Sequence, residues 1–263
     1  MSFRVCVRVT ALMFVCAFVT AVPANAGQTP APAAKSAPAA APKLQWHGTL
    51  NGGLAVADGA QAQRGFQVGM NVKRPFSDHG SFVAQASHQY QRVTFPDDTT
   101  LTDRTAASTG IDADLTTRTI LMARSMYLRD SVMYINSRFE QLIGYGLHLH
   151  DRTQRFEFKL VPGISVFQQD LAYSDVDGWE GGWGFYEEFS GKINAAWSVE
   201  NAFRIRNNFK RKDHSVESNL ALNGAITKQL GLQIEYQYNH ESIVPPDYPK
   251  YLQVLSVGLR FKF

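Results

Sequence analysis

The sequence predicts an all-β fold, a closed antiparallel transmembrane β-barrel of twelve strands. Three observations lead to it: an N-terminal export segment, a period-2 alternation of apolar and polar residues from Leu44 onward, and a last strand that ends in Phe263. Segments of about ten residues that alternate in this way have one face suited to lipid and one suited to a polar lumen. A soluble sandwich also alternates, but its strands do not repeatedly carry charged residues on the minority face.

The first element is an export signal. Arg4 and Arg8 precede a short apolar stretch, and the small residues Ala24 and Ala26 follow it in an A-x-A pattern. This arrangement is typical of a secretory signal peptide, so we predict that residues 1–26 are removed by cleavage after Ala26. The apolar stretch is shorter than the roughly 20 residues that a membrane-spanning helix needs.

The second element is a linker. Residues 27–43 consist almost entirely of Ala, Pro, Lys and small polar residues, which favour extended, solvated conformations. We predict a periplasmic linker there, followed by one barrel domain at 44–263. Both cysteines, Cys6 and Cys16, belong to the signal peptide, so the exported chain has no disulfide and no thiolate metal site. Its nearly balanced charge gives no electrostatic reason to expect nucleic acid as a partner.

The remaining elements are strands. In the last of them Leu255, Val257 and Leu259 alternate with Ser256 and Gly258, and the segments before it repeat the pattern. An even number of strands places the first and the last residue of the barrel domain on the same side of the membrane, the periplasmic side. In order along the chain, the predicted strands are about 44–57, 63–74, 81–94, 103–115, 118–128, 137–150, 155–168, 182–191, 194–207, 214–227, 231–242 and 250–263.

The connections between these strands alternate between short and long. We expect the short ones to be periplasmic turns and the long ones, which include 96–102, 129–136 and 169–181, to be external loops. Aromatic residues should then form a ring at each membrane interface. The periplasmic ring comprises Trp46, Phe82, Phe156, Trp197, Phe261 and Phe263, and the outer ring comprises Phe66, Tyr90, Phe139, Trp183, Phe203, Tyr238 and Tyr251.

The eighth strand breaks the pattern, because Glu187 and Glu188 are adjacent. In a regular strand one of the two carboxylates must face lipid. A β-bulge, or a position above the hydrocarbon layer, would remove the conflict.

The final strand, residues 255–263, resembles the terminal strand of bacterial outer-membrane proteins. The resemblance implies an outer-membrane location, and biogenesis with periplasmic chaperones and the barrel-assembly machinery as partners. It also implies lasting contact with outer-membrane lipid and lipopolysaccharide. The residues that would form the assembly signal are Val257, Leu259, Phe261 and Phe263.

A narrower resemblance covers most of the barrel domain. It rests on Arg138, Gly144-Tyr145-Gly146, Tyr236-x-Tyr238, Pro245-Pro246 and Val257-Gly258-Leu259. In these the chain resembles the salt-induced outer-membrane protein family, a domain family of unknown function. The resemblance implies a response to salt or osmotic stress and brings no catalytic residues.

Charged residues of both signs lie on the predicted inner face. They are compatible with a narrow passive channel lined by charge, and equally with an Arg–Glu network that fills the lumen. A barrel of about twelve strands lies between filled eight-stranded barrels and open porins, so its size leaves both interpretations open. The predicted lumen-lining residues are Arg138, Glu140, Arg155, Glu157, Lys159, Glu200, Arg204, Arg206, Glu217, Glu235, Arg260 and Lys262.

Other chemistry has weaker support in the sequence. His148, His150, Asp112 and Asp114 face inward, but they match no metal-binding spacing, and we predict neither a metal nor another cofactor.

Two further interpretations stay open. A lipid-cleaving barrel would use a serine and a histidine such as Ser242 and His240, which can lie on one face. Ser87 and His88 are sequence neighbours on opposite faces, so they cannot pair directly. No third catalytic group is evident, so we predict that the protein is not an enzyme. A structural or interaction protein would act through its external loops or its linker, and the sequence does not define an oligomeric state.

Overall fold

Twelve antiparallel strands make up the barrel in the computed structural model, which describes residues 45–58, 63–94, 99–151, 155–173, 178–245 and 250–263. The predicted signal peptide and linker lie outside the described residues, and Pro42–Phe263 forms one compact unit. The strand number that the sequence predicts is therefore confirmed. The strands are β1 (His47–Asp58), β2 (Gln63–Ser77), β3 (Gly80–Thr94), β4 (Thr99–Asp114), β5 (Thr119–Asp130), β6 (Ile135–His150), β7 (Phe156–Leu171), β8 (Glu180–Lys192), β9 (Trp197–Asn208), β10 (His214–Ala225), β11 (Leu230–Glu241) and β12 (Tyr251–Lys262).

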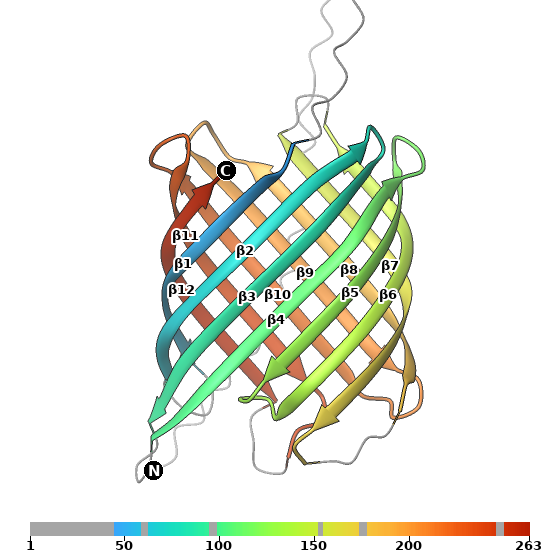
Figure 1. Ribbon diagram of the computed structural model, residues 1–263, viewed down its shortest axis with the longest axis vertical. Coiled ribbons are helices and arrows are strands. Elements are labelled where there is room, and N and C mark those ends of the chain that lie inside the picture. The colour runs from blue at the N-terminus through green and yellow to red at the C-terminus, as the bar shows by residue number, and fades with distance from the viewer. Residues whose placement is uncertain (1–44, 59–62, 95–98, 152–154, 174–177, 246–249) are drawn as a thin grey trace, which may run out of the picture. The chain divides into compact units, whose positions relative to one another are not determined.

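Each strand pairs with its neighbours in sequence, and β1 pairs with β12 to close the barrel (Figure 1). At this seam Gly48 and Phe263 exchange backbone hydrogen bonds of 3.0 and 3.1 Å. A side chain at Gly258 would overlap the carbonyl oxygen of Gly52, so the close approach of the two strands requires glycine there. Closure gives each strand a hydrogen-bonded neighbour on both sides, so the sheet has no edge strand.

Two names describe the ends of the barrel. The terminal end is the one where β1 begins and β12 finishes, and the loop end is the opposite one, where β1 finishes and β2 begins. Because the number of strands is even, β1 begins at the same end of the barrel at which β12 finishes, as the sequence predicts.

The outer surface of the barrel is apolar. Leu54 is 75% exposed and Ile164 is 70% exposed, although both lie within strands. An apolar surface of this extent is unusual in a protein solvated by water, whereas hydrocarbon solvates it well. Within the described part of the chain, no helix has the length and apolar character required to cross a membrane. Other large apolar side chains exposed on the outside include Leu50, Val68, Met70, Ile143, Val166, Leu220, Leu255, Val257 and Leu259.

Outward-facing aromatic side chains lie near both ends of the strands. At the terminal end Trp46 packs edge-on against Phe82, with ring centroids 6.3 Å apart. At the loop end Phe66 and Tyr90 approach to 5.5 Å. Phe203 differs from the predicted arrangement, because it lies near the middle of β9 (Trp197–Asn208), where its ring contacts Phe185.

Strand β8 is regular, and no bulge separates its two adjacent glutamates. Glu188 points inward, where its carboxylate lies 3.1 Å from the Lys159 ammonium group. Glu187 therefore points outward, between Leu160 and Phe203 on the neighbouring strands. The alternation of the strand places one carboxylate on the apolar surface.

The connection between β5 and β6 at the loop end is shorter than the sequence suggests. Residues 129–136 form a predicted external loop, but β5 continues to Asp130 and β6 begins at Ile135, which leaves the four-residue turn 131–134. The strand pairing is irregular at Leu128/Asp130, and again at Ile135/Ser137 between β6 and β7. At these β-bulges the strand pairing continues although the side-chain alternation is interrupted. A search for period-2 alternation therefore does not detect these strand ends.

A charge on the outer surface should destabilise the barrel according to its depth. Ile143 lies at the middle of β6, outward-facing and 58% exposed, and Leu147 lies on the same face nearer the terminal end. We expect Ile143→Arg to lower the free energy of unfolding by about 2–4 kcal/mol and Leu147→Arg by about 0–1 kcal/mol. Denaturant unfolding from lipid vesicles measures both, and equal effects would contradict a lipid-facing β6.

Candidate functional site

Ionised side chains occupy much of the barrel interior. Most of the predicted lumen residues are buried or half-buried and take part in hydrogen bonds or ion pairs with other strands. Those at inward-facing strand positions are Arg138, Glu140, Glu157, Lys159, Glu200, Arg204, Arg206, Glu217, Glu235 and Arg260.

Two of the predicted lumen residues lie elsewhere. Arg155 is exposed in the turn that precedes β7, where its backbone N–H donates to the Asp151 carboxylate at 2.6 Å. The turn ends one residue later than the sequence suggests, which removes Arg155 from the strand alternation. Lys262 is the last residue of β12 and is exposed at the terminal end. Both are therefore rim residues.

An apolar cluster lies across the loop end of the interior. Its residues come from β5–β7 and from β1 and β12, which lie on opposite sides of a ring of twelve strands. Side chains from opposite walls therefore meet in the middle of the lumen. We call this cluster the loop-end seal, and its buried members are Ala55, Leu128, Met133, Ile135, Leu171, Leu252 and Val254.

The turn 131–134 supplies the centre of the seal. Asp130 Oδ1 accepts hydrogen bonds from the backbone N–H groups of Val132 and Met133, both at 3.1 Å. Tyr134 has a positive φ of 58°, a backbone conformation that residues other than glycine rarely adopt. The result is a turn that folds inward and leaves Met133 only 2% exposed.

A layer of ion pairs lies directly beneath the seal. Arg138 on β6 makes a bidentate pair with Glu241 on β11, with N–O distances of 2.7 and 3.1 Å. Arg104 on β4 pairs with Asp130 at 3.0 Å and donates to Asn239 on β11 at 2.9 Å. The Arg104–Asp130 pair lies between the neighbouring strands β4 and β5. The Arg138–Glu241 and Arg104–Asn239 contacts join strands that are not neighbours in the sheet. They cross the lumen and add a polar closure to the apolar one.

Arg206 extends the same layer. Its side chain is fully buried, its guanidinium group lies 4.4 Å from the centre of the Phe167 ring, and its Nη2 lies 3.7 Å from Glu241. The Glu241 carboxylate is therefore shared between Arg206 and Arg138. Two buried guanidinium groups contact the same carboxylate.

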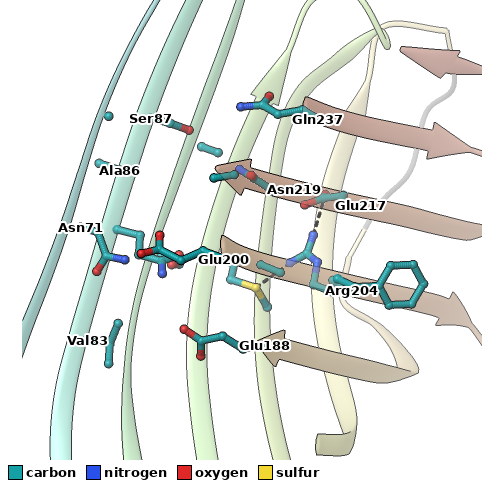
Figure 2. A pocket seen from close by; sticks show the side chains of 18 of the residues that line it. Asn71, Val83, Ala86, Ser87, Glu188, Glu200, Arg204, Glu217, Asn219 and Gln237 are labelled. Atoms are coloured by element: carbon teal, nitrogen blue, oxygen red, sulfur yellow. Dashed lines mark hydrogen bonds and ion pairs between the residues drawn. The ribbon is translucent and has the colours of Figure 1, made fainter. Parts of the chain in front are cut away.

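A second ionic group spans the middle of the barrel. Arg204 on β9 donates to Glu217 at 2.8 Å, lies 3.6 Å from Glu140, and reaches Met126 on β5. Figure 2 shows the contacts of Arg204 with Glu217 and with the sulfur atom of a methionine. This group lines the open part of the lumen.

A cavity of about 490 Å³ lies between the seal and the terminal end (Figure 2). It extends from Leu128 and Arg138 beneath the seal, past Arg204, to Thr49 and Lys73 toward the terminal end. This volume is within the roughly 300–1,000 Å³ that small-molecule sites usually have. We call this cavity the vestibule.

Further ion pairs line the vestibule. Lys159 lies 3.1 Å from both Asp112 and Glu188 and 3.3 Å from Glu157. Arg260 on β12 pairs with Glu200 on β9 at 2.8 Å. The charges that face the vestibule are therefore held largely by each other.

The histidines considered as metal ligands have other partners. His148 lies between two carboxylates, with Nδ1 2.6 Å from Asp114 and Nε2 3.0 Å from Glu157. The ring of His150 lies 5.5 Å from that of His148. Within the described ranges, no group of three or more His, Cys, Asp and Glu side chains has an arrangement that could hold a metal ion.

Among the residues that the structure describes, the serines and histidines considered for lipid cleavage form no hydrogen bonds with each other. Ser87 lines the vestibule, whereas His88 forms a 2.9 Å hydrogen bond with Thr105. His240 stacks on His214, and the Ser242 hydroxyl accepts a hydrogen bond from the His214 backbone at 2.7 Å. Neither described serine is hydrogen-bonded to the histidine proposed as its base.

Sequence reasoning missed several interior groups. Arg104, Arg124 and Asp130 are buried ion-pair partners, and Met133 belongs to the seal. Arg124 could have been found, because it lies at period-2 spacing within a strand. Met133 could not, because it lies in a turn where alternation carries no information.

These features define a class: an antiparallel β-barrel with an apolar outside, a polar vestibule and a closed loop end. The chain belongs to the family described as "protein of unknown function, DUF481", whose model matches residues 50–263. No curated protein matches the sequence.

Two solved structures with similar folds are outer-membrane barrels. One is an outer-membrane channel from Pseudomonas putida F1, at 12% sequence identity and a TM-score of 0.52, with 87% of this chain and 100% of that one covered. The other is the NanC porin, also at 12% identity and a TM-score of 0.52, with 82% of this chain and 100% of that one covered. At this identity the likeness concerns the fold alone.

The shared carboxylate of Glu241 should be important for stability. We expect Glu241→Gln to lower the free energy of unfolding by about 3–5 kcal/mol, because it removes the carboxylate that both buried guanidinium groups, of Arg138 and Arg206, contact. Asp103→Asn is the matched control, because its partner Arg129 is 56% exposed and stays solvated, so the loss of this pair should cost at most about 1 kcal/mol. Denaturant unfolding compares the two variants, and a Glu241→Gln protein as stable as the control would exclude this role.

Proposed function

We propose that this protein is an outer-membrane channel for small polar solutes, and that the structure represents its closed state. The observation that carries the proposal is the polar vestibule, which ends beneath a seal whose centre is one four-residue turn. A short turn between two bulged strand ends can change position without any break in the barrel wall.

The proposed location in the outer membrane rests on the barrel surface. Apolar residues cover the outside, and aromatic pairs lie near both strand ends, as membrane interfaces favour. The two structural neighbours are an outer-membrane channel and a porin. In this orientation the vestibule faces the periplasm and the seal faces the cell exterior.

Export and assembly complete the proposal. Residues 1–26 would be the cleaved signal, with Ala24 and Ala26 at the cleavage site, and residues 27–43 a periplasmic linker. Strand β12, which carries the proposed assembly signal, exposes alternate residues on the outside and closes the barrel against β1. We propose the barrel-assembly machinery, periplasmic chaperones and the surrounding lipopolysaccharide as its partners. The residues of the assembly signal are Val257, Leu259, Phe261 and Phe263.

A permanently closed, structural barrel is the second candidate. The ion pairs favour it, because Arg138–Glu241 and Arg260–Glu200 connect strands across the lumen. Such a network fixes the shape of a barrel whether or not solute passes. Conductance distinguishes the two candidates.

A substitution in the turn 131–134 tests whether the seal controls passage. We expect Met133→Asp to increase the time spent open at least about tenfold, because an unpaired carboxylate is costly inside an apolar cluster. Single-channel recordings in planar bilayers compare it with the wild type. Ala172→Asp is the control, because it adds the same charge at an exposed position of the neighbouring connection.

The recordings decide between the candidates. Rare steps in the wild type and frequent steps in Met133→Asp alone support a gated channel. Silence in both proteins, with the folded barrel verified by heat-dependent gel mobility, supports the structural barrel. A wild type that conducts as often as Met133→Asp would show that the seal does not control passage.

A further inference from the structure

One side of the vestibule is lined by amide side chains. They are Asn51 on β1, Asn71 on β2, Gln85 on β3, Asn219 on β10, and Gln233 and Gln237 on β11. With β12, these strands follow one another around the barrel, so the amides form one continuous wall. We call these six residues the amide wall, and Figure 2 shows Asn71, Asn219 and Gln237 around the cavity.

A buried carboxylate orients part of this wall. Glu235 accepts hydrogen bonds from the side-chain NH₂ groups of Asn219 at 2.6 Å, Gln237 at 2.7 Å and Gln67 at 2.9 Å. An amide that donates its NH₂ group in one direction directs its carbonyl oxygen elsewhere. Asn219 and Gln237 are thereby held with acceptor atoms available to a solute.

Two other amides keep both groups available. Asn71 and Gln85 are directly opposite each other on β2 and β3. Asn71 is exposed to the cavity, and no hydrogen bond joins either amide to another described side chain. Each offers a donor and an acceptor, which is the combination that a hydroxyl group satisfies.

The far side of the vestibule is apolar in part. Met126 on β5 and Tyr186 on β8 line the cavity and pack on a buried cluster that contains Ile120 and Leu142. Strand β5 is opposite β11, and β8 is opposite β2, so this apolar surface is opposite the amide wall. A solute between them meets hydrogen-bonding groups on one side and a surface for C–H groups on the other.

The charges in the vestibule favour neither ionic sign. Cations and anions line it in nearly equal numbers. Among the described lining cations, each except Lys73 has an ion-pair partner, as in Arg204–Glu217 and Arg260–Glu200. A charged solute would therefore gain little attraction and would lose its hydration.

We infer that the vestibule binds a neutral, polyhydroxylated solute of sugar size, with its hydroxyl groups on the amide wall and its C–H groups toward Tyr186. This inference rests on the proposed function, because the solute of a channel enters the vestibule before it passes. It adds the chemical class of that solute.

Titration calorimetry of the protein in amine-oxide micelles tests the inference, because such a detergent has no sugar headgroup to compete. The probes are trehalose as the neutral ligand, and gluconate and glucosamine as charged ligands with similar hydroxyl groups. We expect saturable binding of trehalose and weaker binding of both charged probes.

The variants locate the site. Asn71→Leu combined with Gln85→Leu should weaken trehalose binding at least about fivefold, because it removes two donor–acceptor pairs. Gln168→Leu is the control, because Gln168 is an exposed amide on the outer face of β7 and its loss should leave binding unchanged. Far-UV circular dichroism and gel mobility verify that each variant is folded.

Three results would overturn the inference: no trehalose binding by the wild type, tighter binding of a charged probe, or binding unaffected by the double substitution. Conductance of the Met133→Asp protein separates this outcome from failure of the proposed function. A conducting channel without a trehalose site leaves the channel proposal intact. A silent barrel whose trehalose binding depends on Asn71 and Gln85 leaves the binding site and removes the channel.

Discussion

The backbone hydrogen bond is the interaction on which the rest of this structure depends. A strand in hydrocarbon has no water to satisfy its N–H and C=O groups, so each strand needs a partner on both sides. The pairing of β1 with β12 meets that requirement for the first and last strands. Closure also divides every strand into an outward and an inward face. The apolar outside and the charged inside are therefore two consequences of one ladder.

Closure at twelve strands determines how wide the interior is. The lumen is narrow enough for Arg138 to reach Glu241 from the far wall, and for Leu252 to meet Met133 in the seal. A wider barrel would leave these side chains in water, where exposed pairs contribute little. Because they are buried, each charge needs a partner, and the partners hold one another across the ring. The space that remains is the vestibule.

The period of two was enough to predict the strand number and most of the inward positions. Arg138, Glu140 and Lys159 could be placed because they lie inside regular strands. Their partners could not be predicted, because alternation defines a face and does not specify which far strand a long side chain reaches. Arg155 was misplaced for a related reason: at a strand end, one residue of turn decides between lumen and rim. The turn 131–134 escaped prediction because its inward fold depends on tertiary packing with β1 and β12.

Asp130 couples the two closures of the loop end. Its Oδ1 accepts the N–H groups of Val132 and Met133, and its Oδ2 pairs with Arg104, which donates in turn to Asn239. The position of the turn and the ionic layer beneath it are therefore bound to a single buried carboxylate. If the turn moves outward, Asp130 must give up either the turn or Arg104, and a buried charge without its partner is costly. The apolar seal and the ionic layer should accordingly open together. A state in which only one of the two has opened is therefore unfavourable.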